Sequence, residues 1–134
     1  MENDRLAARE KKLIHILFFC FGFGIMAWIP RFPEVKSNLG LENGAFGSLM
    51  STGSIGAFFG LLTVGHIIHK YGALRVTITS ILILFTSLMC LVHIHSSFIF
   101  LILNITFGFG ITAVHVSLNS HSFHFLERSK INLV

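Results

Sequence analysis

The chain has 134 residues, of which 53% are hydrophobic and only 12% are charged. A soluble globular domain carries roughly 25% charged residues, so this composition excludes an ordinary soluble domain and indicates a protein embedded in the lipid bilayer. The net charge of +4 comes from basic residues scattered at the ends of apolar runs, so we expect no nucleic-acid partner. Cys20 and Cys90 lie inside apolar runs, and we expect small buried residues there rather than a disulfide.

The first apolar segment follows a polar, basic start and is expected to span the membrane over residues 13–30. A basic start and a short apolar run are also typical of a secretory signal peptide, but no cleavage site of small residues follows. Trp28 is expected to anchor this span at the membrane interface. Pro30 and Pro33 are expected to end the helix, because proline lacks the N–H group and clashes with the preceding turn. Residues 31–43 would then form the longest loop.

The second segment, residues 44–68, carries no formal charge and is long enough to span as one helix. Its small residues recur at i, i+3, i+4 and i+7, which places Gly53, Gly56, Ala57 and Gly60 on one helical face. Where no water drives helices together, such a face allows a neighbouring backbone to approach closely. We therefore predict that Gly53, Gly56 and Gly60 form a helix-packing surface.

Residues 76–126 contain no formal charge and are too long for one span. A polar patch at residues 93–97 divides them into a third span over residues 75–94 and a fourth over residues 98–123. The sequence therefore predicts an all-α integral membrane protein, with four transmembrane helices in a single unit over residues 1–134.

The distribution of lysine and arginine predicts the orientation of the spans. Four precede the first span, two lie in the turn at 69–75 and two follow the fourth span, whereas the 30–43 loop holds two and the 94–97 turn none. Because cytoplasmic segments carry the excess of positive charge, we expect both termini and the 69–75 turn in the cytoplasm. An even number of spans agrees with this arrangement.

A stripe of polar and small residues runs along the fourth span at spacings of three or four, and comprises Asn104, Gly108, Thr112, His115, Asn119 and Ser122. These positions fall within about 80° of one another on a helix. Polar groups at membrane depth need partners or water, so the stripe either lines a solute pathway or packs against another helix. For the first alternative, Asn104, His115 and Asn119 are the candidate groups that line the substrate cavity. No Asp or Glu lies inside any predicted span, which weakens the case for proton coupling at His115.

Eight histidines raise the question of a metal site. Two pairs are spaced i, i+3, His66 with His69 and His121 with His124. Zinc requires three or four converging ligands, whereas these pairs stand at helix ends, so we expect neither a metal nor another cofactor. The sequence contains no nucleophile–base pair, phosphate-binding glycine loop or paired carboxylates, so we do not expect an enzyme.

The segment GHIIHKYGALR at 65–75 resembles the cytoplasmic turn between helices 2 and 3 of the major facilitator superfamily. That signature has a glycine, an acidic residue four positions on, a basic residue next to it, then a glycine and a closing basic residue. The matching positions are Gly65, Lys70, Gly72 and Arg75, while His69 takes the acidic position. In the family the carboxylate takes part in charge pairing that steadies the inward-closed gate, so His69 departs from the pattern.

Two further segments resemble bacterial permeases related to fucose-type sugar carriers. They are IPRFPEVKSNLGLENGAFGSL and VSLNSHSFHFLER, the second containing Asn119, Glu127 and Arg128. The resemblance covers residues 13–128 and implies a fold of twelve helices in two six-helix halves, with the substrate between the halves. It also implies that helices 1 and 4 lie along the central cavity and that helix 2, with its glycine face, lies at the interface between the halves.

The resemblance therefore implies a truncated, N-terminal part of an alternating-access carrier for a small polar solute such as a sugar, located in a bacterial inner membrane. Its partners would be the bilayer, the solute, and either the missing remainder of the permease or further copies in an oligomer. A small four-helix oligomeric exporter is an alternative, although the first span lacks the membrane-embedded Glu of that class. The other alternative is a non-transporting membrane protein that binds subunits through the Gly53–Gly60 face, or an inactive remnant.

Overall fold

The computed structural model describes residues 2–131, and the side chains among them except those of 2–4, 7, 126 and 128–131. Within that range all the regular secondary structure is helical. The elements are α1 (Glu2–Trp28), the 3-10 helix η1 (Ile29–Arg31), α2 (Phe32–Leu39), α3 (Asn43–Ser51), α4 (Gly53–Tyr71), α5 (Ala73–Val92) and α6 (Ser97–Ile131).

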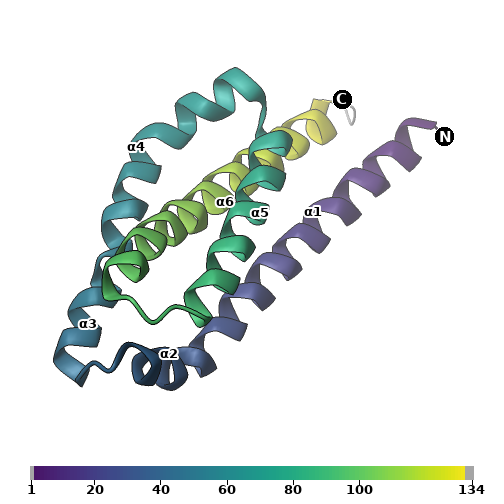
Figure 1. Cartoon of the computed structure of the whole chain (residues 1–134). Helices are drawn as coiled ribbons and strands as arrows, with labels where there is room; N and C mark the ends of the chain where they lie inside the picture. The colour runs from purple at the N-terminus through teal and green to yellow at the C-terminus, as the bar shows by residue number, and fades with distance from the viewer. Residues whose placement is uncertain (1, 132–134) are drawn as a thin grey trace.

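Four helical stretches are long and apolar enough to cross a membrane, at 8–39, 43–71, 73–92 and 97–125. They run alternately up and down, so the start of α1 and the end of α6 lie at the same end of the bundle as the α4–α5 turn, and the other two connections lie at the opposite end (Figure 1). The prediction of an all-α membrane protein with four spans is confirmed.

The expected loop at residues 31–43 is wrong, because most of it is helical. Proline is tolerated in the first turn of a helix, where its missing N–H group has no partner in any case. Pro30 accordingly lies in the first turn of η1, which begins at Ile29, and Pro33 in the first turn of α2, which begins at Phe32. Helix α2 turns away from α1 (Figure 1) and ends at Gly40, whose positive φ of 62° suits glycine. Its Asn38 side chain donates to the Val92 carbonyl at 3.3 Å, which ties α2 to the end of α5.

The expected second span lies within 43–71, but it is not one regular helix, because α3 and α4 are separated by a break at Thr52. The Thr52 hydroxyl donates to the Leu49 carbonyl at 2.7 Å, and the Thr52 N–H bonds the same carbonyl at 3.2 Å. These i to i−3 contacts tighten the chain and interrupt the regular α-helical ladder.

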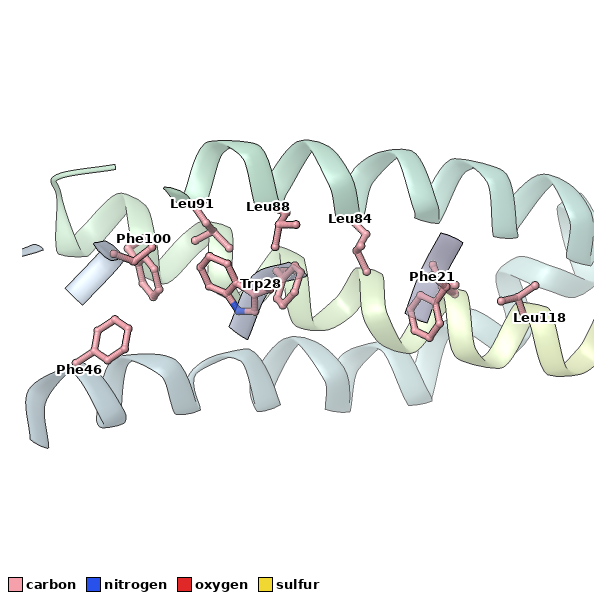
Figure 2. Close-up of a cluster of buried hydrophobic side chains, with 11 residues drawn as sticks. Phe21, Trp28, Phe46, Leu84, Leu88, Leu91, Phe100 and Leu118 are labelled. Atoms are coloured by element: carbon pink, nitrogen blue, oxygen red, sulfur yellow. The ribbon is translucent and has the colours of Figure 1, made fainter. Parts of the chain in front are cut away.

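Helix α6 is the centre of the bundle and packs mainly against α4 and α5. Figure 2 shows side chains from α1, α3 and α5 gathered along α6, with leucines of α5 pointing toward it. The buried core comprises Phe21, Trp28, Val35, Phe46, Leu84, Leu88, Leu91, Phe100, Phe107, Val114 and Leu118. Trp28 belongs to this core with 4% of its surface exposed, so its prediction as an interfacial anchor is wrong.

Large apolar side chains also remain exposed on every span, for example Phe19, Phe58, Leu82 and Phe98. Such an outer surface suits helices whose solvent is lipid. Cys20 and Cys90 lie on this surface as free, exposed thiols, so the expectation that they are buried is wrong.

Candidate functional site

The glycine face of α4 lies directly against α6. A Cβ atom added to Gly56 would lie 1.8 Å from the Ile105 carbonyl oxygen, and one added to Gly60 would lie 2.9 Å from Thr112 Cβ. On the facing helix, a Cβ added to Gly108 would lie 1.9 Å from the Gly53 carbonyl oxygen. The two backbones therefore touch, as small residues allow in membranes. The partner of this face is α6 of the same chain, which corrects the expectation that it meets a second half.

Asn104 holds the break between α3 and α4. Its side chain is only 2% exposed, and its Nδ2 donates toward the Leu49 and Met50 carbonyls at 3.1 and 2.9 Å and toward Thr52 Oγ1 at 3.1 Å. The Leu49 and Met50 carbonyls beside the break thus receive a further donor from α6. Sequence reasoning missed Thr52, because a lone threonine before a glycine carries no distinctive signal.

Helix α4 crosses α6 at an angle and leaves the polar stripe beyond Thr112. Thr112 is buried against Gly60. One turn further along α4, Val64 packs instead in a cluster with Val76 of α5 and Ala113 of α6. The rest of the stripe is therefore not covered by α4. At its end, the Ser122 hydroxyl donates to the Leu118 carbonyl of its own helix at 2.9 Å.

His115 and Asn119 lie on the uncovered part of the stripe, and both are exposed. They are about 40° apart around α6, so they face the same way. The edge of the His115 ring meets Phe21 of α1 with 5.0 Å between ring centroids. Among the side chains that the structure describes, none is found hydrogen-bonded to His115 or Asn119. Two hydrogen-bonding groups are thus open beside α1 at membrane depth.

The predicted cytoplasmic turn is a one-residue connection between α4 and α5. Gly65 lies on the exposed surface of α4, His69 and Lys70 in its last turn, and Arg75 in the first turn of α5. Gly72 joins the helices at φ 87° and ψ 146°, a conformation that side chains disfavour. Lys70 Nζ stands 5.3 Å from the centre of the Tyr71 ring.

A pocket of 480 Å³ with several ionisable side chains in its lining adjoins this turn. It is lined by Arg75 and residues of the turn, by Glu10 of α1, and by His121 and His124 of α6. Sequence reasoning missed Glu10 because its nearness to the turn depends on the packing of α1. In the part of the chain that the structure describes, no three metal-ligating side chains converge.

A bundle of four apolar spans with buried polar cross-links and two uncovered polar groups defines a polytopic membrane protein. Residues 8–132 match the family model of the Major Facilitator Superfamily, so the chain belongs to this superfamily. An uncharacterized MFS-type transporter of Yersinia pestis is 27% identical over 104 residues, which are 78% of this chain and 27% of the relative. The chain thus corresponds to about a quarter of that relative's length. No solved structure matches it.

Proposed function

We propose that the four spans form part of an alternating-access carrier that moves a small neutral polar solute, such as a sugar, across a bacterial inner membrane. The proposal rests on one observation above all, the uncovered pair His115 and Asn119 on the central helix. Polar groups at membrane depth need water, a solute or further protein against them. The superfamily match over residues 8–132 favours water and solute.

The chemistry of the pair supports a neutral solute. An amide and an imidazole donate and accept hydrogen bonds, which suits hydroxyl groups. The apolar runs at 13–29, 44–68 and 76–126 contain no Asp, Glu, Lys or Arg that could pair with a charged solute. Asn104, also a candidate for this cavity, instead uses its amide to hold the break in the second span. We therefore assign solute contact to His115 and Asn119, and packing to Asn104.

The alternatives gain no support from this arrangement. The glycine face that would recruit another subunit is occupied by α6. The membrane-embedded Glu of small four-helix exporters has no counterpart in the first apolar run.

A thermal-shift screen in detergent tests the solute class. Neutral monosaccharides and polyols are compared with amino acids and organic acids of similar size. A ligand at about 100 times its Kd adds about 2.7 kcal/mol to the stability of the folded state, so a true solute raises Tm. We expect a neutral compound to raise Tm in the parent and in Ile78→Ala but not in Asn119→Ala. A response only to charged compounds, or one that Asn119→Ala retains in full, would contradict the proposal.

A further inference from the structure

A second, apolar groove lies on the other side of the central helix. It has a volume of 420 Å³ and runs between α4 and α5 over α6. Its apolar lining includes Val64, Ile67, Ile83, Phe109 and Ala113. At 100° per residue, Phe109 and Ala113 lie about 120° and 160° around α6 from His115. The groove is thus separate from the candidate solute site.

One end of the groove is cationic. Tyr71, the last residue of α4, and Arg75, in the first turn of α5, both line it there and are both exposed. The ion pairs found among the described side chains join Arg31 to Glu34 and His124 to Glu127, so neither uses Arg75. Residues 65–75 contain no carboxylate, since His69 stands where the superfamily signature is acidic. Tyr71 and Arg75 also line the adjoining pocket that contains Glu10 of α1, but no ion pair between Glu10 and Arg75 is found among the described side chains. A cation and a phenol therefore stand at the mouth of the apolar groove.

The groove has the length of a lipid chain within one leaflet. Arg75 and Ile83, at its two ends along α5, are eight residues apart, or about 12 Å at the helical rise. One leaflet of the hydrocarbon core is about 15 Å thick. A head group beside Arg75 therefore leaves its acyl chain alongside the apolar walls.

We propose that this groove binds one phospholipid with a net negative head group. The phosphate accepts hydrogen bonds from the Arg75 guanidinium and the Tyr71 hydroxyl, and one acyl chain lies between α4 and α5. Lys70, next to Tyr71, adds a second positive charge near the head group. A transmembrane helix of another copy is a poorer occupant, because an apolar helix would cover Arg75 without offering it a carboxylate or phosphate.

The charge part of the proposal is tested by native mass spectrometry of the purified full chain. Phosphatidylglycerol and phosphatidylcholine with identical acyl chains are added at equal concentration, and the ratio of their bound forms is measured. A basic residue near an anionic lipid surface strengthens binding about fivefold. We expect the ratio to favour phosphatidylglycerol and to fall about fivefold in Arg75→Gln.

The control Arg9→Gln removes an exposed charge of α1 at the same end of the bundle and is expected to leave the ratio unchanged. Equal ratios in the parent and Arg75→Gln, or equal losses in both variants, would overturn the proposal.

The groove itself is tested with a matched pair on α5. Thr79 lines the groove, while Thr86 is exposed on the same helical face seven residues away and outside it. Each hydroxyl bonds a carbonyl of its own helix, at 2.9 and 2.8 Å. We expect Thr79→Phe to abolish bound phosphatidylglycerol and Thr86→Phe to retain it. Equal lipid binding in both variants, or loss of dimers rather than of lipid in Thr79→Phe, would overturn the proposal and make the groove a helix contact.

Discussion

Asn104 shows how a polar residue on a membrane helix can serve packing alone. Its amide reaches three acceptors around the break at Thr52, namely the Leu49 and Met50 carbonyls and the Thr52 hydroxyl oxygen. In the hydrocarbon core no water is available to hydrogen-bond these backbone carbonyls. The amide therefore fixes where the second span bends and how closely α3 approaches α6.

We predict that Asn104→Leu, which keeps the size but removes the donors, lowers the free energy of unfolding by about 1–2 kcal/mol. Reversible unfolding in mixed micelles, followed by circular dichroism, measures this change. Asn119→Leu is the matched control on the same helix, because no hydrogen bond to Asn119 is found in the described structure. Equal destabilisation by both variants would show that the break does not depend on the amide.

At the scale of helices, the contact between α4 and α6 depends on the absence of side chains. We predict that Gly56→Ala lowers the free energy of unfolding by about 1–3 kcal/mol, because the new methyl group meets the Ile105 carbonyl and forces the helices apart. Gly65→Ala, on the same helix with no atom within 4 Å of the added Cβ, is expected to gain up to about 1 kcal/mol from helix propensity.

The same unfolding assay compares the two glycine variants. Both substitutions change helix propensity equally. The free energy of unfolding is therefore expected to fall in Gly56→Ala and to rise in Gly65→Ala only because the added methyl groups meet different surroundings. If Gly56→Ala proves as stable as Gly65→Ala, the backbones of α4 and α6 do not touch as described.

The four spans could be predicted from the sequence because a bilayer demands long apolar segments, and the charged or polar breaks between them are plain. The break at Thr52 could not, because the amide that hydrogen-bonds around it belongs to Asn104, 52 residues away. Helix α2 is not evident from the sequence, because Pro30 and Pro33 are typical of the end of the preceding helix, although proline is equally tolerated in the first turn of a new one.

From the sequence, the candidate site could be predicted only as a stripe of polar residues along one face of the fourth span. Asn104 and Asn119 are the same residue type on the same face of one helix, and nothing local separates their roles. The path of α4 separates the roles of these two residues. Helix α4 covers Asn104 and Thr112 and then continues toward the contact between Val64 and Ala113. That path follows from packing between segments far apart in the sequence.

For the whole molecule, the arrangement of charges sets the orientation in the membrane. The N-terminal segment, the α4–α5 turn and the segment after the fourth span hold eight of the ten lysines and arginines. We predict that a cysteine at exposed Ser37 on α2 reacts with a membrane-impermeant thiol reagent added to intact cells, whereas one at Lys70 reacts only after the cells are opened. Cys20 and Cys90 are replaced beforehand. Labelling of Lys70→Cys in intact cells would reverse the assigned orientation.

The most direct test of the account is the water accessibility of Asn119 in membranes. Two single-cysteine variants are made in the cysteine-free protein. Asn119→Cys lies on the proposed pathway, and Ile78→Cys lies on α5. Ile78 is 46% exposed at a similar depth, since the adjacent Thr77 hydroxyl lies 2.9 Å from Ser117 Oγ. We expect a small water-soluble thiol reagent to label Asn119→Cys much faster than Ile78→Cys, because one thiol faces water and the other faces lipid. Equal rates, or no labelling at Asn119→Cys, would contradict the proposed solute pathway.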